Sequence, residues 1–146
     1  VIEGQTRAHA RIINLLGVKQ VIVLINKMDE KTVGYSKARY DECANEMRDM
    51  LVKVGFKKEQ VQNNIPIIPV SAWSGDNVVT KSANMPWWEG QEVTGLTGNK
   101  VRVNSLVDAL NNLVVNPPRN FDAPLRVPIS GVYNIKGAGT ILTGRI

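Results

Sequence analysis

The sequence has little cysteine, no long apolar run and no segment typical of membrane targeting. Cys43 is the only cysteine among 146 residues, which excludes an internal disulfide and is typical of a reducing compartment. The longest uninterrupted apolar run extends from Val21 to Ile25, whereas a membrane-spanning helix needs roughly 20 apolar residues. No basic segment followed by an apolar one opens the chain, as it would in a signal peptide. We therefore expect a cytoplasmic protein with no membrane partner.

The composition is that of a soluble globular protein. Hydrophobic residues make up 43% and charged residues 21% of the chain, and the mean hydropathy is -0.13, so neither a disordered nor a fibrous chain is expected. The length suits one ordinary domain, or one domain and a piece of another. The net charge of +5 leaves two interpretations open, because no stretch is continuously basic. We favour scattered solubilising charge over a surface for nucleic acid.

Apolar periodicity divides the first 116 residues into alternating helices and strands. The predicted helices are 5–16, 36–55 and 105–115, and the predicted strands, covered on both faces as in a parallel sheet, are 18–25 and 65–70. Pro66 and Pro69 cannot donate ladder hydrogen bonds, so the second strand must pair on one side there or forgo two bonds. Residues 75–104 have no sustained period and predict a long loop or a small insertion.

The pattern changes after residue 116. Residues 116–120 contain two prolines that end the preceding helix, and the segments beyond residue 125 alternate around a glycine-rich turn at 136–139, as in a β-hairpin. We therefore divide the chain into residues 1–116, a linker at 117–124, and the incomplete start of a β domain at 125–146.

Polar residues follow both predicted strands of the first segment, where ligands of open α/β sheets bind. They are Asn26–Asp29 after the first strand and Ser71–Trp73 after the second. The Asp29 carboxylate has two acceptor oxygens in one plane, which match the N1–H and 2-amino donors of guanine. Adenine lacks this donor pair and would leave Asp29 desolvated and unpaired. An Asn-Lys-x-Asp segment alone also occurs in unrelated turns, but the second polar strand end favours guanine recognition.

Roles for the neighbouring residues follow from their chemistry. We expect the Lys27 stem to cover the base plane and the Asn26 amide to tie the neighbouring loops together. We expect the Ser71 hydroxyl to orient Asp29 and the Ala72 backbone N–H to donate to the guanine 6-oxo group.

Two further residues lie within these segments, Met28 in the first and Trp73 in the second. Both are counted as candidate binding residues. For Trp73, as for Trp87 and Trp88, stacking on a base competes with local anchoring, and we favour anchoring because it is the more common role of loop tryptophans.

Several blocks of the sequence resemble translation elongation factor 1-alpha and its elongation-factor-like relatives. The blocks are Gly4 to His9, Gly17 to Val23 with Asn26 to Asp29, Pro69 to Asn77, Asn84 to Trp88, and the segments 123–129 and 131–145. Their order over nearly the whole chain makes the resemblance specific. Ala8 replaces the usual Glu, and Ala72 replaces a Gly that is more frequent in eukaryotic members, but alanine keeps the backbone donor. Residues 90–104 and 130–133 favour the elongation-factor-like branch.

This resemblance implies a GTPase that delivers aminoacyl-tRNA to the ribosome. On this basis residues 1–116 are the C-terminal half of a P-loop-type GTP-binding domain, and residues 125–146 open an antiparallel β-barrel domain. The implied ligand is GTP or GDP, with Mg²⁺ held elsewhere in the parent protein, and the implied partners are aminoacyl-tRNA, the ribosome and a guanine-nucleotide exchange factor. The implied base-binding residues are Asn26, Lys27, Met28, Asp29, Ser71, Ala72 and Trp73.

The sequence also lacks motifs that such an enzyme requires. No G-x-x-x-x-G-K-[ST] loop and no D-x-x-G segment occur in the 146 residues, so the chain has none of the usual phosphate and Mg²⁺ contacts. We therefore expect no catalytic residue and no metal ligand here, weak GTP affinity for the isolated chain, and a longer parent protein that hydrolyses GTP. The alternative is a nonenzymatic module that binds RNA or filaments, in which the base motif is vestigial.

Overall fold

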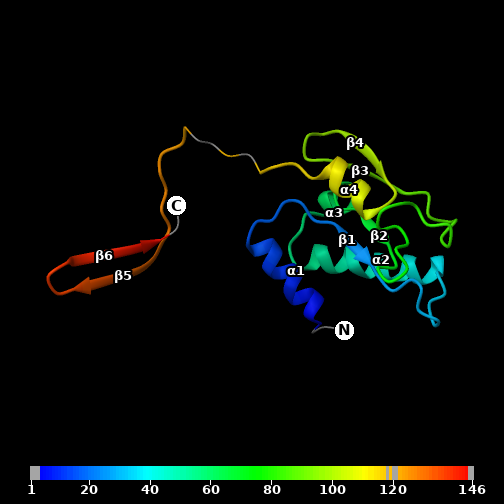
Figure 1. The fold of residues 1–146 in the computed structure, drawn as a ribbon, viewed down its shortest axis with the longest axis horizontal. Coiled ribbons are helices and arrows are strands. Elements are labelled where there is room, and N and C mark those ends of the chain that lie inside the picture. Colours follow the sequence, from blue (N-terminus) through cyan, green and yellow to red (C-terminus); the bar gives the residue numbers. More distant parts are fainter. Residues whose placement is uncertain (1–3, 118, 120–121, 145–146) are drawn as a thin grey trace. The chain divides into compact units, whose positions relative to one another are not determined.

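The computed structural model describes residues 4–117, 119 and 122–144. These residues form two compact units that divide between Val115 and Asn116. The elements of the first unit are α1 (Gln5–Leu15), β1 (Val23–Ile25), α2 (Lys37–Lys53), α3 (Lys58–Asn63), β2 (Ile67–Pro69), β3 (Gln91–Thr94), β4 (Lys100–Val103) and α4 (Leu106–Leu113), and those of the second are β5 (Ile129–Ile135) and β6 (Gly139–Gly144) (Figure 1).

A parallel pair of three-residue strands lies at the centre of the first unit. β1 pairs with β2 from Val23 opposite Ile67 to Ile25 opposite Pro69. The predicted strand over 18–25 is therefore too long. The reason is that pairing begins where the Pro66 carbonyl accepts the Val23 N–H at 2.9 Å, and the chain before Val23 has no strand partner within the described residues.

The other edge of β2 is satisfied by side chains instead of a strand. The Gln91 amide accepts from Ile67 N–H at 2.9 Å and donates to Ile65 C=O at 3.4 Å. The Tyr40 hydroxyl donates to Ile67 C=O at 2.7 Å, and the Asn77 amide donates to Pro69 C=O at 2.9 Å. Pro69 therefore needs no ladder donor, because β2 pairs with a strand on one side only.

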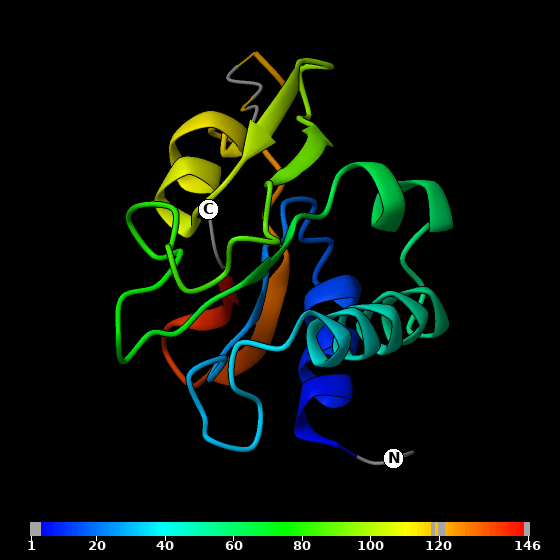
Figure 2. The same cartoon turned by 90° about the vertical axis from the view of Figure 1, so that its right-hand side faces the viewer.

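The three predicted helices are present and two have side-chain caps. Ser36 Oγ accepts from Arg39 N–H at 3.4 Å at the start of α2, and Ser105 Oγ accepts from Asp108 N–H at 3.2 Å at the start of α4. Both views place α1 and α2 on one side of the β1–β2 pair and α4 on the other (Figure 2). This arrangement leaves the carboxyl ends of β1 and β2 at one edge of the unit.

Helix α2 links two apolar clusters. Its first half contributes Tyr40 and Ala44 to a cluster that contains β2 and α4 side chains, and its second half contributes Leu51 to a cluster with α1 and α3. The Tyr40 ring lies 5.3 Å from Trp87 and 5.7 Å from Trp88, centroid to centroid. Each aromatic pair of this kind stabilises a fold by roughly 0.5 to 1.5 kcal/mol beyond the effect of buried apolar area. Trp87 and Trp88 therefore stabilise the packing of the loop before β3 against α2.

Two elements differ from the sequence prediction. Residues 75–104 contain the antiparallel β3–β4 hairpin, in which Val93 pairs with Val101. Its strands are only four residues long, so their alternation is too brief to detect. Helix α3 was also missed, because its six residues include one apolar side chain, Val61, which is 1% exposed.

The second unit is the predicted β-hairpin. β5 and β6 pair antiparallel, with a register shift between Ile129 and Gly131. Ala138 N–H donates to Ile135 C=O at 3.0 Å across the turn, where Gly137 has a φ of 91°. The predicted linker at 117–124 includes residues 118, 120 and 121, and the predicted β domain includes 145 and 146; these five lie outside the described residues.

Candidate functional site

The segment that follows β1 is a tight turn held through its backbone. Met28 N–H donates to Val70 C=O at 3.2 Å, and Glu30 N–H donates to Lys27 C=O at 3.1 Å. Lys27 has a φ of 64°, in the left-handed region. The Met28 side chain is 1% exposed and lies in the core, so Met28 offers only its backbone to the site, whereas the Lys27 side chain is exposed.

Asn26 joins the ends of the two strands. Its Oδ1 accepts from its own neighbour, Lys27 N–H, at 2.7 Å and from Ala72 N–H at 3.0 Å. This is the tie between loops that the sequence predicted for Asn26. It brings the segments 26–29 and 71–73 together at the carboxyl ends of β1 and β2.

Asp29 presents an open carboxylate beside this tie. The residue is half-buried, and within the described part of the chain no N–H or O–H group donates to its side chain. A half-buried carboxylate without protein donors retains its full capacity to accept hydrogen bonds from a ligand.

Ser71 and Ala72 both form hydrogen bonds at the end of β2. Ser71 is fully buried, and its Oγ accepts from Ser74 N–H at 3.1 Å. No hydrogen bond joins Ser71 to Asp29 within the described residues, and the bond from Ser74 N–H leaves the Ser71 O–H donor unused, so the orienting role of the Ser71 hydroxyl stays a prediction. The Ala72 N–H already donates to Asn26.

The three loop tryptophans divide into two kinds. Trp87 Nε1–H donates to Tyr35 C=O at 2.9 Å and Trp88 Nε1–H donates to Asn104 C=O at 2.9 Å, so both are anchors as predicted. Trp73 is 93% exposed, and the prediction that it is an anchor is wrong. A large apolar ring that is left exposed next to Ala72 is available to a ligand.

A further connection between the chain segments that follow β1 and β2 was not predicted from the sequence. The Tyr35 hydroxyl donates to Asp76 Oδ2 at 2.9 Å. This hydrogen bond is the main cause of the raised pKa of Tyr35, with a smaller contribution from burial. Asp76 Oδ1 also accepts from Ser82 Oγ at 2.5 Å and from Asn84 Nδ2 at 3.1 Å. No spacing rule relates positions 35 and 76, so the sequence carries no periodic signal for this pair.

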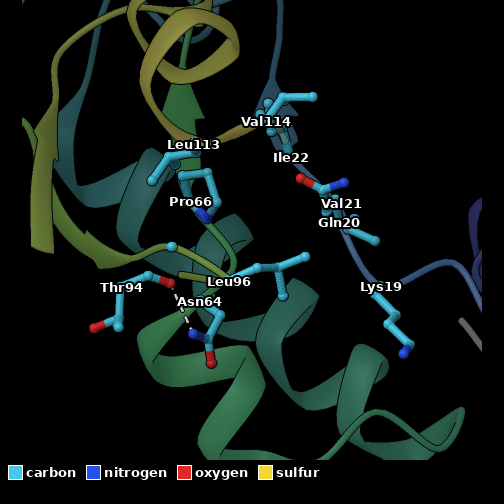
Figure 3. A pocket seen from close by; sticks show the side chains of 11 residues that line it. Lys19, Gln20, Val21, Ile22, Asn64, Pro66, Thr94, Leu96, Leu113 and Val114 are labelled. Carbon is cyan, nitrogen blue, oxygen red and sulfur yellow. Dashed lines mark hydrogen bonds between the residues drawn. The ribbon is translucent and has the colours of Figure 1, made fainter. Parts of the chain in front are cut away.

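Two cavities of the first unit lie away from the predicted residues. One of about 30 Å³ lies at the amino ends of β1 and β2, beside Ile22, Pro66 and the hydrogen bond from Asn64 Nδ2 to Thr94 C=O (Figure 3). It is large enough for one or two waters but too small for a base. Another of about 370 Å³ lies between α2 and α3, and its lining includes Arg48, Asp49 and Lys58.

The described residues contain no group of three or more His, Cys, Asp or Glu side chains that could hold a metal ion. No helix in the described part of the chain has the length and apolar character needed to cross a membrane.

Comparison with known proteins decides the family. Residues 2–116 match the family described as Elongation factor Tu GTP binding domain. The chain belongs to this family. The resemblance to elongation factor 1-alpha is also confirmed, since proteins of that name from Blastocystis hominis and Tetrahymena pyriformis are 49% and 45% identical over 144 residues. These matches cover 98% and 99% of the chain but only 29% of each relative.

Solved structures lead to the same family. Crystal structures of Sup35 complexed with GMPPNP and with GDP match with TM-scores of 0.60 and 0.62 at 30% and 33% identity. The matches cover 97% and 95% of the chain and 31% and 30% of the Sup35 chains. The mixed helix and strand fold is therefore that of the elongation factor Tu GTP-binding domain family.

Proposed function

We propose that the segments 26–29 and 71–73 bind the guanine base of GTP or GDP in a translation elongation factor. The observation that carries this proposal is the Asp29 carboxylate, half-buried at the end of β1 and free of protein donors within the described residues. Asn26 ties its loop to Ala72 at 3.0 Å, so both strand ends contribute to one site. Membership of the elongation factor Tu GTP-binding domain family supports the same assignment.

The base contacts follow from hydrogen-bond chemistry. The two Asp29 oxygens accept from the N1–H and 2-amino groups of guanine, at about 1.5 to 3 kcal/mol for each charge-assisted bond. The exposed stem of Lys27 and the exposed ring of Trp73 provide apolar surface for the base faces. Because Ala72 N–H donates to Asn26 Oδ1, a bond from it to the guanine 6-oxo group requires Asn26 to share or release this donor.

The domain organisation and the biological role are part of the proposal. Residues 1–116 are the C-terminal half of a P-loop-type GTP-binding domain, 117–124 a linker, and 125–146 the start of a β-barrel domain. The parent protein is a cytoplasmic GTP hydrolase whose partners are aminoacyl-tRNA, the ribosome and a guanine-nucleotide exchange factor. The elongation-factor-like branch remains a prediction.

Mg²⁺ does not fit the residues that the structure describes. The described residues offer no cluster of carboxylates or imidazoles for a metal ion, and the sequence has neither the phosphate loop nor the D-x-x-G segment. The proposed role of these residues is therefore base recognition alone.

The test is Asp29→Asn in the full-length polypeptide that carries this chain, with GDP and RNA binding measured side by side. An asparagine side chain keeps one acceptor but turns a donor toward the guanine 2-amino group. We expect the GDP dissociation constant to rise by about 10² to 10⁴, because two charge-assisted bonds are lost or weakened. RNA binding should not change.

The alternative module makes the opposite prediction. If the base motif is vestigial, neither GDP binding nor RNA binding responds to Asp29→Asn. The matched control is Asn111→Asp on the exposed face of α4. It also changes the net charge by one, but at a position away from the strand ends. An unchanged GDP affinity in Asp29→Asn would overturn the proposed function.

A further inference from the structure

Tyr35 is bonded at three points, each to a different segment. Its N–H donates to Met28 C=O at 2.8 Å, which closes the loop that contains Asp29. Its carbonyl accepts from Trp87 Nε1–H at 2.9 Å, and its hydroxyl donates to Asp76 Oδ2 at 2.9 Å. The residue has a φ of 58°, a conformation that costs a non-glycine residue free energy and persists only where the surroundings hold it.

Asp76 is bonded to the second loop in the same way as Tyr35 is bonded to the first. Its backbone C=O accepts from Ser71 N–H at 3.1 Å, and the two residues form an isolated antiparallel bridge. Asp76 is 9% exposed. Its carboxylate accepts hydrogen bonds from Ser82 and Asn84 in addition to Tyr35. A buried carboxylate with three donors has one arrangement that satisfies all of them, so its position is well defined.

We propose that the hydrogen bond between Tyr35 and Asp76 is a positioning pin that sets the Asp29 loop against the Ser71–Trp73 loop for reading the base. The inference rests on the proposed function, because it concerns how that site is held. Tyr35 reaches the first loop through Met28, the residue before Asp29, and Asp76 reaches the second through Ser71, the residue before Ala72. Neither side chain is assigned a contact with the base.

The pin complements the direct tie between Asn26 and Ala72. The tie joins Asn26 to Ala72 at 3.0 Å, and Met28 N–H donates to Val70 C=O at 3.2 Å, so both of these connections lie next to the carboxyl ends of β1 and β2. The pin adds a connection farther from the strand ends, at positions 35 and 76, which follow the two segments in sequence. Connections near the strand ends and beyond the two segments together restrict the relative rotation of the loops, which determines whether Asp29 reaches both guanine donors together.

The experiment compares GDP with inosine diphosphate, which lacks the 2-amino group, in the full-length polypeptide. The unaltered protein is expected to prefer GDP by about ten- to a hundredfold, because one charge-assisted hydrogen bond is missing with inosine diphosphate. Tyr35→Phe removes only the hydroxyl of the pin. We expect this variant to lose about tenfold of that preference, since Asp29 no longer meets both donors at once.

Tyr40→Phe is the matched control. It also removes a tyrosine hydroxyl with a short hydrogen bond, 2.7 Å to Ile67 C=O, but that bond supports β2 and not the loops. Both variants should lower thermal stability, whereas only Tyr35→Phe should change the ratio of the two dissociation constants. A merely structural role for Tyr35 would lower stability and leave the ratio unchanged.

The outcomes separate the pin from the proposed function. One outcome is that the unaltered protein prefers GDP and Tyr35→Phe retains the whole of that preference. This result overturns the pin and leaves the proposed function standing. Equal losses of preference in Tyr35→Phe and Tyr40→Phe also overturn it. If the unaltered protein binds GDP and inosine diphosphate equally, the proposed function and the pin both fail.

Discussion

The Oδ1 atom of Asn26 accepts the backbone N–H of Ala72 at 3.0 Å, across 46 positions of the sequence. The same oxygen accepts from Lys27 N–H at 2.7 Å, so one side-chain oxygen fixes both its own turn and the neighbouring strand end. This relationship brings the two polar segments together, and it links the fold of the β1–β2 pair to the proposed base recognition.

Removing this side chain should loosen both segments. For Asn26→Ala we expect the free energy of unfolding to fall by about 0.5 to 1.5 kcal/mol, because two exposed backbone donors lose their protein acceptor and bond to water instead. GDP affinity should fall by at least tenfold, because the two loops of the variant are less well ordered than those of the unaltered protein. Urea unfolding and calorimetric titration measure the two effects, and Asn111→Ala on α4 should change neither. A variant with unaltered GDP affinity would show that the tie is not needed by the site.

Gln91 should contribute to the stability of the fold. Its amide replaces a strand along β2, and Gln91→Ala leaves the Ile67 N–H, now bonded at 2.9 Å, without an acceptor in a fully buried strand. We expect a loss of about 1 to 3 kcal/mol in the free energy of unfolding. Gln62→Ala, at an exposed position of α3, should lose less than about 0.5 kcal/mol. Equal effects of the two changes would contradict the role assigned to Gln91.

Stability should decline at high pH because of Tyr40. Burial raises the pKa of the Tyr40 hydroxyl from 10.0 to about 12. Between pH 10 and pH 12 the unfolded chain has lost this proton while the folded protein retains it, so the free energy of unfolding falls as pH rises through this window. The contribution is fully present below pH 10 and amounts to roughly 2 to 3 kcal/mol.

Comparison with Tyr40→Phe isolates this effect from lysine titration. We expect urea unfolding of the unaltered protein to lose more stability than the variant between pH 9.5 and pH 11.5, values chosen around the window set by the pKa shift. Parallel curves for the two proteins would show that Tyr40 ionises as easily in the folded state as in the unfolded chain.

Trp73 should affect binding without affecting folding. The ring is 93% exposed, so Trp73→Ala should change the free energy of unfolding by less than about 0.5 kcal/mol. GDP affinity should weaken by roughly tenfold, in the range that base stacking on an aromatic ring provides. Trp88→Ala should behave in the opposite way and lose about 3 to 5 kcal/mol of stability. Undiminished GDP affinity in Trp73→Ala would remove Trp73 from the site.

Local signals in the sequence were sufficient for much of the fold. The serines at positions 36 and 105 begin helices as their side-chain chemistry predicts, and the β-branched run before Asn26 contains β1. The turn chemistry of residues 136–139 predicted the hairpin of the second unit. In each case the residues that decide the structure are neighbours in the chain.

The remainder depends on pairs of residues that are distant in sequence. Gln91 satisfies the edge of β2, and Tyr35 reaches Asp76 over 41 positions. Such side-chain hydrogen bonds have no period and no fixed spacing, so a single sequence does not reveal them. The bond from Ser74 N–H to Ser71 Oγ is a local one, three positions apart, that was also not predicted from the sequence.

The most direct test of the account is the base preference of Asp29→Asn for GDP against xanthosine diphosphate. Xanthine carries a 2-oxo group where guanine has the 2-amino donor, so it suits an asparagine amide and repels the Asp29 carboxylate. Calorimetric titration of the full-length polypeptide should show GDP preferred by the unaltered protein and xanthosine diphosphate preferred by the variant. If both proteins bind the two nucleotides with the same ratio of dissociation constants, Asp29 does not read the base and the account is wrong.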